Sequence, residues 1–537
     1  VIDKFGYTIF KLAEPMLPGE ELKFDFEVTY RTKGFKEGGS NTRVVYNGTF
    51  FSNAYFPSIG YNSGFELGDD DDRKEFDMEP KERMMERDDP IGLSQSLFGD
   101  DADKISFEIT VSTDSSQIAI APGYLTKKWT EGNRAYYHYK MDTPMINFYS
   151  VVSAEYEVKR DVWKQPVDSL GDVNLEIYYH KGHEANLDRM MNGLKKALTY
   201  YTENFSPYQF RQLRIMEFPA YSSFAQSFAN TVPFSEGIGF VQEIKEDDVN
   251  LPFYVTAHEV AHQWWGHQVT EAGVKGNAML SETMSQYSAL MVMKQEFPPE
   301  QIRKFLRYEL QSYLTGRTFE RKKEMPIELV ESQNYIHYRK GSLLMYALQD
   351  YISEDSVNMA FKRYNQEWAF KEGIYPTTKD LIGYIDEVTP DSLKYILDDF
   401  FRTITLHDNR TKEATYEELP DGRYQVNLEI ESKKFRADSL GKEKEIALGD
   451  YIDVGIFKKT EDEKDKLIYL KKYQITENET SLSIIVDEEP FSAGIDPINK
   501  LIDRNPGDNV KEVSKADDEK ETEESKVTAE VLPDAKE

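Results

Sequence analysis

Thr256-Ala-His-Glu-Val-Ala-His-Gln-Trp-Trp265 is the stretch of this 537-residue sequence that says most about its fold and chemistry. The apolar and aromatic residues on both sides of the two histidines favour a buried helix. Because His258 and His262 lie four residues apart, a helix projects both imidazoles from one face, about one turn apart. Two nitrogens at that spacing can reach one zinc ion at roughly 2.0–2.1 Å. The stretch therefore predicts a helical metal site.

Glu259 completes the H-E-x-x-H arrangement of this stretch. It follows His258 directly, so on a helix it points about 100° away from that imidazole. From there it cannot easily bind the same metal, but it can reach a water bound to the metal. The chain has 8 histidines, and two of them flank this glutamate at ligand spacing. That coincidence favours a metal site with Glu259 as general base over a chance match on an amphipathic helix.

A catalytic zinc usually takes three protein ligands and leaves one position for water. Glu282, in the stretch Ala278-Met-Leu-Ser-Glu-Thr283, begins a second helical run and is the preferred third ligand. Glu271 is nearer in sequence, but it lies in a Gly-rich connector and stays as the alternative. We therefore predict one Zn²⁺ per chain, bound by His258, His262 and Glu282.

The composition restricts the classes of partner. The chain has 65 basic and 96 acidic residues, which give a net charge of −31. Nucleic acid and anionic lipid would repel such a chain, so both are excluded as partners. The absence of cysteine removes disulfides, thiolate metal sites and cysteine nucleophiles. No apolar run approaches the roughly 18 residues that a membrane span needs, and no signal peptide is visible.

Hydrophobic periodicity divides the chain into four parts. Residues 1–160 predict a β-rich domain, because stretches such as Leu22–Tyr30 and Arg134–Tyr139 alternate apolar and polar side chains. Residues 161–403 predict a mostly helical domain, with an amphipathic helix over Leu187–Phe205.

Alternation returns in residues 404–505, as in Arg423–Ile430, and predicts a small β-sandwich. Residues 506–537 contain 11 acidic and 5 basic residues and no aromatic one. Such a composition cannot bury enough apolar surface to order itself, so this segment predicts a disordered acidic tail.

These residues resemble a known family. The stretch His258-Glu-Val-Ala-His-Gln-Trp-Trp-Gly266, followed by Leu280-Ser-Glu282, resembles the M1 family of zinc aminopeptidases, a gluzincin group. Here 19 residues separate His262 from Glu282, one more than in the family pattern. Tyr338-Arg-Lys-Gly341 resembles the family's Tyr-x-Lys-Gly element. This resemblance implies that Tyr338 stabilises the oxyanion of the reaction, with Tyr335 as a nearby competitor.

A further stretch, Pro233-Phe-Ser-Glu-Gly-Ile-Gly-Phe-Val241, resembles the family's Gly-x-Met-Glu-Asn motif and the Trp-Gly that follows it. The resemblance implies that Glu236 binds the free α-amino group of a substrate, because a carboxylate pairs with an ammonium. It also places Gly237 and Gly239 in the substrate-binding stretch. The alternative is that Glu236 only caps a β-turn.

The resemblance implies a multi-domain α+β fold. It predicts an N-terminal β-saddle domain, a thermolysin-like, mostly α-helical catalytic domain, a small C-terminal β-sandwich and the disordered acidic tail. The short C-terminus looks like that of bacterial M1 modules fused behind membrane-spanning, transporter-permease-like regions. The resemblance to these modules implies covalent attachment to such a region and an extracytoplasmic (periplasmic) location, with a soluble cytoplasmic protein as the alternative; the start at Val1 is consistent with this expectation but does not show it.

The implied function is a zinc-dependent aminopeptidase that acts on peptide substrates with a free N-terminus. A metal-activated water would attack the N-terminal peptide bond, with Glu259 as the general base and Tyr338 as the oxyanion stabiliser. Two alternatives stay open. One is a peptide-specific endopeptidase, and the other is a non-catalytic peptide-binding module of a membrane assembly.

Overall fold

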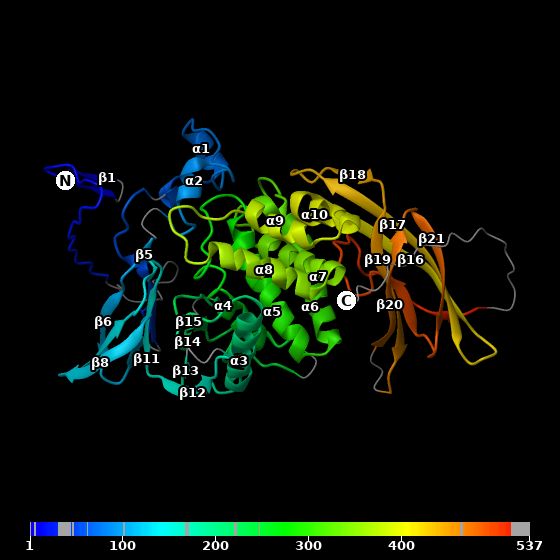
Figure 1. Cartoon of the computed structure of the whole chain (residues 1–537), viewed down its shortest axis with the longest axis horizontal. Helices are drawn as coiled ribbons and strands as arrows, with labels where there is room; N and C mark the ends of the chain where they lie inside the picture. Colours follow the sequence, from blue (N-terminus) through cyan, green and yellow to red (C-terminus); the bar gives the residue numbers. More distant parts are fainter. Residues whose placement is uncertain are drawn as a thin grey trace.

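The computed structural model describes residues 2–4, 7–30, 44–45, 48–61, 63–99, 103–166, 171–219, 223–245, 248–461 and 465–516. Three parts follow one another along the long axis of the molecule: a β-rich N-terminal part, a helical middle and a β-rich C-terminal part (Figure 1). This order confirms the predicted multi-domain α+β architecture. In the described part of the chain, no helix is both long and apolar enough to cross a lipid bilayer.

The N-terminal part consists of small antiparallel sheets. One has the strand order β3-β4-β11-β7, another β6-β9-β8, and two further pairs are β1-β2 and β10-β5. The strands are β1 Ile2–Lys4, β2 Tyr7–Ile9, β3 Val44–Val45, β4 Gly48–Ser52, β5 Lys104–Ile105, β6 Glu108–Asp114, β7 Ile118–Ile120, β8 Tyr124–Glu131, β9 Arg134–Lys140, β10 Met145–Ile146 and β11 Ser150–Ala154. Short helical turns lie between them: η1 Asn53–Tyr55, η2 Ser63–Phe65, α1 Asp70–Glu75 and α2 Pro90–Ser94.

One predicted strand of this part is wrong. Residues 22–30 alternate apolar and polar side chains, yet they form no strand in the structure. Phe24, Phe26 and Val28 stay about half exposed. Alternation produces a strand only where a neighbouring strand supplies the hydrogen bonds, and no described strand lies beside this segment.

The helical middle begins with a four-stranded sheet of order β12-β13-β14-β15. Strand β12 is antiparallel to β13, whereas β13, β14 and β15 are parallel to one another. The strands are β12 Glu157–Trp163, β13 Val173–Tyr179, β14 Gln212–Phe218 and β15 Thr231–Ser235. The predicted domain boundary at residue 160 therefore falls inside β12, because alternation cannot tell which sheet a strand joins.

Most helices of the middle part share one large hydrophobic core with this sheet. They are α3 Leu187–Asn204, α4 Leu251–Ala261, η4 Met279–Thr283, α5 Met284–Glu296, α6 Pro299–Thr318, η5 Ile327–Leu329, η6 Tyr335–Lys340, α7 Gly341–Ile352, α8 Glu354–Trp368, α9 Thr378–Val388, η7 Asp391–Leu393, α10 Tyr395–Leu397 and η8 Asp398–Arg402. Helix α3 confirms the predicted amphipathic helix. It buries nine residues along one stripe, which packs against β13 and α4.

The C-terminal part is a sandwich of two sheets. One has the order β18-β17-β16-β24 with β21 also paired to β17, and the other β20-β19-β22-β23. The strands are β16 Ile404–Glu418, β17 Tyr424–Ala437, β18 Glu443–Ile446, β19 Asp450–Lys459, β20 Asp465–Ile475, β21 Glu479–Val486, β22 Ser492–Ile495, β23 Val510–Glu512 and β24 Ser514–Lys515. Inward-facing residues such as Val426, Leu428 and Ile430 form its core.

The predicted tail begins too early. Residues 510–512 and 514–515 form β23 and β24, which add to the edges of the two sheets. Strand β23 pairs with β22 and β24 with β16, and these backbone hydrogen bonds order the segment although its composition is that of a disordered tail. The rest of the predicted tail, residues 517–537, lies outside the described residues.

Candidate active site

Helix α4 carries the first two predicted ligands. The side chain of Asn250 caps its N-terminus by accepting a hydrogen bond from the Phe253 backbone N–H at 3.3 Å. Helix α3 lies against it at Gly193, where a Cβ would come within 3.1 Å of the Phe253 carbonyl oxygen. Glycine therefore permits the close approach of the two helices. On this helix the rings of His258 and His262 have centroids 4.7 Å apart.

Glu282 lies on the π-helical turn η4, which leads directly into α5. Such turns insert an extra residue into a helix and occur frequently at functional sites. Trp265 Nε1 donates a hydrogen bond to Ser288 Oγ at 3.0 Å and so ties the segment after α4 to α5. Thr283 Oγ1 donates to the His337 carbonyl oxygen at 2.6 Å and ties η4 to η6. These contacts bring Glu282 towards the two histidines.

The three predicted ligands form a nearly regular triangle of donor atoms. His258 Nε2 lies 3.1 Å from His262 Nε2, and Glu282 Oε2 lies 3.2 Å and 3.3 Å from these two nitrogens. Tetrahedral zinc with bonds of roughly 2.1 Å needs donors about 3.4 Å apart. Two imidazoles and one carboxylate at this spacing fit Zn²⁺. Glu271 is not part of the group that these three residues form in the described part of the chain.

Electrostatics favour a cation at this triangle. Burial alone would raise the pKa of Glu282, but the charge of His262 and the hydrogen bonds with both imidazoles hold it well below its usual value. Burial opposes protonation of His262, yet Glu282 raises its pKa to about 9. Burial lowers the pKa of His258. An ionised carboxylate is the form that a metal binds, and a dication at this site would take the place of the proton that Glu282 holds on His262.

The contact between His262 Nδ1 and the Trp265 carbonyl oxygen, at 3.0 Å, orients this imidazole. When Nδ1 carries the proton and donates it to the carbonyl, Nε2 keeps its lone pair for a metal. Hydrogen bonds of this kind fix the ring and raise the basicity of metal-binding histidines. The segment just after α4 thus supplies both a ligand and the group that orients it.

The two predicted catalytic groups border the same space. Glu259 is 6% exposed, and its Oε2 has no hydrogen-bond partner among the described residues. Burial raises the pKa of Glu259 to about 8. The ring of Tyr338, on the π-helical turn η6, has its centroid 6.0 Å from that of His258. Burial, and then Glu282, raise the pKa of Tyr338, so its phenol is neutral and can donate a hydrogen bond.

A pocket of about 380 Å³ is lined by the three predicted ligands and by the two predicted catalytic residues, Glu259 and Tyr338. The N-terminal part contributes a hydrophobic wall that includes Leu97, Phe98 and Phe148. Phe98 and Phe148 pack with ring centroids 4.6 Å apart. The segment before β15 adds another border, residues 224–227. The pocket therefore lies between the N-terminal β-rich part and the helical middle, and sequence patterns along either part alone give no sign of this wall.

The structure does not bring the predicted amine-binding residues to this pocket. Glu236, Gly237 and Gly239 do not line it, and Glu236 instead lies in a cluster with two histidines and Glu217. Gly239 has a packing role, because a Cβ there would lie 2.4 Å from the Phe234 ring. Substrate binding by these three residues therefore stays a prediction, and residues 224–227 border the pocket instead.

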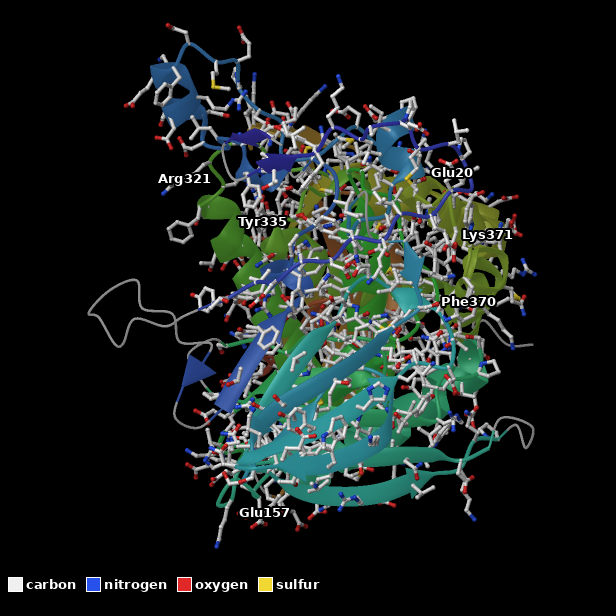
Figure 2. All side chains as sticks on the ribbon, turned by 90° about the vertical axis from the view of Figure 1, so that its left-hand side faces the viewer. Glu20, Glu157, Arg321, Tyr335, Phe370 and Lys371 are labelled. Atoms are coloured by element: carbon white, nitrogen blue, oxygen red, sulfur yellow. The ribbon has the colours of Figure 1, made fainter. Side chains whose placement is uncertain are left out.

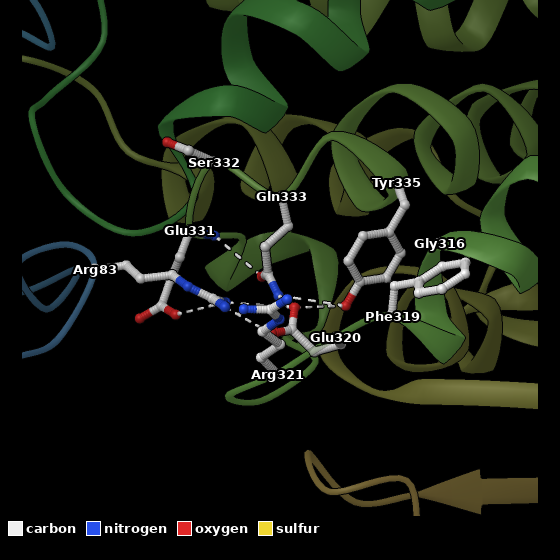
Figure 3. Close-up of a pocket in the computed structure, with 9 residues that line it drawn as sticks. All are labelled: Arg83, Gly316, Phe319, Glu320, Arg321, Glu331, Ser332, Gln333 and Tyr335. Atoms are coloured by element: carbon white, nitrogen blue, oxygen red, sulfur yellow. Dashed lines mark hydrogen bonds and ion pairs between the residues drawn. The ribbon is translucent and has the colours of Figure 1, made fainter. Parts of the chain in front are cut away.

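Tyr335, the competitor of Tyr338, points into a different pocket. Its hydroxyl donates a hydrogen bond to Glu320 Oε2 at 3.1 Å and accepts one from Gln333 Nε2 at 3.3 Å (Figure 3). This pocket, of about 580 Å³, also includes Arg83 and Arg321, and contains none of the predicted ligands. Figure 2 shows Tyr335 and Arg321 on the flank opposite Phe370 and Lys371.

Comparison with known proteins is consistent with this site. Residues 189–400 match the peptidase family M1 domain. A probable aminopeptidase 1 from Sulfurisphaera tokodaii is 26% identical over 212 residues, which cover 38% of this chain and 26% of that protein. Aminopeptidase M1-C from Oryza sativa subsp. japonica is 22% identical over 303 residues, which cover 55% of this chain and 34% of that protein. The matches thus span about a quarter to a third of these relatives.

Two solved structures show a weaker similarity to this chain. Aminopeptidase A from Legionella pneumophila, in complex with aspartic acid, shares 15% identity at a TM-score of 0.48 and covers 78% of this chain and 45% of its own. An M1 zinc metallopeptidase from Deinococcus radiodurans shares 16% identity at a TM-score of 0.43 and covers 56% of this chain and 65% of its own.

Proposed function

We propose that this chain, whose residues 189–400 match the peptidase family M1 domain, is a zinc-dependent aminopeptidase. The observation that carries the proposal is the triangle of His258, His262 and Glu282 donor atoms, with sides of 3.1, 3.2 and 3.3 Å, in one pocket with Glu259 and Tyr338. Three protein donors leave a coordination position open, as in catalytic rather than structural zinc sites.

A zinc ion at these donors would supply a Lewis acid that polarises the scissile carbonyl and acidifies a water molecule. Glu259 has a free, buried Oε2 and would take the proton of the attacking water, then deliver it to the leaving amine. Tyr338 would donate its phenolic proton in a hydrogen bond to the carbonyl oxygen as negative charge develops there. The low exposure of Glu259, 6%, strengthens its interaction because little bulk water screens it.

The pocket favours substrates with an apolar first residue. Phe98, Phe148 and Phe224 form an aromatic wall. Among the described residues that line the pocket, Glu259 and Glu282 are the only carboxylates, and there is no lysine or arginine. An acidic or basic side chain would be desolvated there without a partner, at a cost of several kcal/mol by general estimates. We expect leucyl and phenylalanyl substrates to be preferred over aspartyl and lysyl ones.

The set of residues that line the pocket also supports a second candidate, a peptidase that does not require a free N-terminus. Among the described residues that line the pocket, the carboxylates are Glu259 and Glu282, and both have roles at the metal centre. No further carboxylate is therefore reserved there for a substrate ammonium. An enzyme of this kind would also cleave acylated or internal peptide bonds.

One experiment tests both candidates. Fluorogenic leucyl and phenylalanyl amides are compared with their N-acetylated forms, using zinc-loaded protein. Cleavage of the free amides alone supports the aminopeptidase, and comparable cleavage of both supports the second candidate. Glu259→Gln should lower kcat by about 10²–10⁴-fold and keep its zinc.

A matched pair of variants tests the third ligand. Glu282→Gln should lose the zinc at this site, whereas Glu271→Gln should keep it. Both residues are glutamates that lie between α4 and α5, and Glu271 is 1% exposed but outside the donor triangle. Absence of turnover on every substrate, in protein that carries zinc at this site, would contradict the proposed peptidase activity.

On the sequence resemblance alone, we further propose an N-terminal β-saddle and a thermolysin-like catalytic domain, in the extracytoplasmic part of a bacterial membrane protein. Fractionation of the native organism tests the location: recovery of the protein from the soluble cytoplasmic fraction would contradict it.

A further inference from the structure

Three parallel strands of the middle sheet end at the same edge, and each brings a metal-binding type of side chain to it. Strands β13, β14 and β15 are adjacent and parallel. His180 directly follows β13, Glu217 is the penultimate residue of β14, and Glu236 directly follows β15. The carboxyl ends of parallel strands are where ligand sites form in such sheets. His183, three residues after His180, joins them from the loop before α3.

These four side chains converge on one point. Each offers one ligand atom, and the four atoms all lie within 4.8 Å of one another. Glu217, whose side chain is 0% exposed, lies at the centre. His180 Nδ1 lies 3.3 Å from Glu217 Oε1, and His183 Nδ1 contacts the same oxygen. The other oxygen, Oε2, accepts a hydrogen bond from the backbone N–H of His180 at 2.6 Å.

We propose that His180, His183, Glu217 and Glu236 bind a second divalent cation of the zinc class, separate from the centre at α4. Two imidazole nitrogens and two carboxylate oxygens suit Zn²⁺ and similar transition-metal dications. A tetrahedral zinc site needs donors about 3.4 Å apart, so the cluster has to contract slightly. His183, whose side chain is 29% exposed, has more room to move than His180, whose side chain is 13% exposed.

The number of donors indicates the role of this site. Four protein donors close the coordination sphere of zinc, as in structural sites, whereas the centre at α4 has three. The ligands come from the ends of three strands and from the loop that leads into α3. The chain after Glu236 leads on to α4 and its histidines. A cation here would hold these segments together and balance the carboxylate of Glu217, which is costly to bury without a positive partner.

Metal content of the full chain tests the proposal. Zinc-loaded and then dialysed protein is analysed by mass spectrometry for zinc per chain. Wild type should hold two equivalents, His180→Gln/His183→Gln one, and His258→Ala one. The combination of all three substitutions should hold none. His138→Gln is the matched control, because this histidine also contacts a glutamate, Glu108, but lies on β9 and belongs to neither cluster; it should retain two.

The outcomes separate this proposal from the proposed peptidase. One equivalent in wild type that only His258→Ala removes would overturn the second site. One equivalent that only the His180/His183 variant removes would uphold the second site and contradict the catalytic one. Glu236→Gln, an isosteric change at the half-buried edge of the cluster, provides a second variant if the double substitution fails to fold. It should weaken zinc retention at one site and leave the other unchanged.

Discussion

Replacing Tyr338 by phenylalanine removes one hydrogen-bond donor from the pocket and leaves the ring in place. The hydroxyl borders the same 380 Å³ space as Glu259 and the metal-binding triangle. Burial keeps the phenol neutral, so it interacts more strongly with a developing oxyanion than with a ground-state carbonyl. Loss of one such donor costs about 2.7–4 kcal/mol, or roughly 10²–10³-fold in kcat. Because ground-state binding changes little, KM should stay within about threefold.

The assay measures initial rates of leucyl-amide hydrolysis over a range of substrate concentrations, with zinc content and a thermal unfolding curve for each variant. Tyr335→Phe is the matched control, since this tyrosine lies on the same π-helical turn but donates to Glu320 in the other pocket (Figure 3). It should keep kcat and KM, and lose about 1 kcal/mol of stability. A Tyr338→Phe protein with full zinc and kcat within threefold of wild type would refute the assigned role.

Gly341→Ala should cost about 1–3 kcal/mol of stability and lower kcat, because the added Cβ would lie 2.6 Å from Thr283 Oγ1 and push η4 away from η6. Gly383 is exposed in the middle of α9, and a Cβ added there meets no atom within 4 Å, so Gly383→Ala should instead stabilise the protein by about 0.4–1 kcal/mol in chemical denaturation. A stabilising Gly341→Ala together with a destabilising Gly383→Ala would contradict this packing. Asp350→Asn should cost about 1.5–3 kcal/mol, because it removes one of the two carboxylates that pair with Lys500, which is 2% exposed, and leaves only Asp453. Burial raises the pKa of Asp350, but the charges of Lys500 and then Lys472 outweigh burial and hold that pKa below its usual value. The stability advantage of wild type over Asp350→Asn should therefore be present above about pH 4 and shrink as the pH falls further. A stability difference that stays constant over this pH range would argue against the ion pair. Treatment with a strong zinc chelator should abolish hydrolysis and added zinc should restore it, whereas activity that persists in metal-free protein would exclude a metallopeptidase.

Local spacing predicted much of the metal centre. His258, Glu259 and His262 lie on one helical turn, and a periodicity of 3.6 residues is sufficient to place two imidazoles on one face. Glu282 followed from the type of residue and the start of a second helix, and the structure brings it to both histidines. The sequence did not predict where Glu236 lies in the fold. The stretch around it differs from the family's Gly-x-Met-Glu-Asn motif at most positions, so the motif can be aligned with more than one stretch of this chain.

The sequence by itself determined the order of β-rich, helical and β-rich parts, the H-E-x-x-H helix and the acidic character of the chain, because each depends on residues that are neighbours along the chain. Only the tertiary structure decided which distant segments meet. It placed an aromatic wall from the N-terminal part beside the metal centre, turned Tyr335 away from it, and gathered His180, His183, Glu217 and Glu236 at one sheet edge. These contacts depend on how sheets and helices pack against one another, and the periodicity of one element does not say which distant element will cover it.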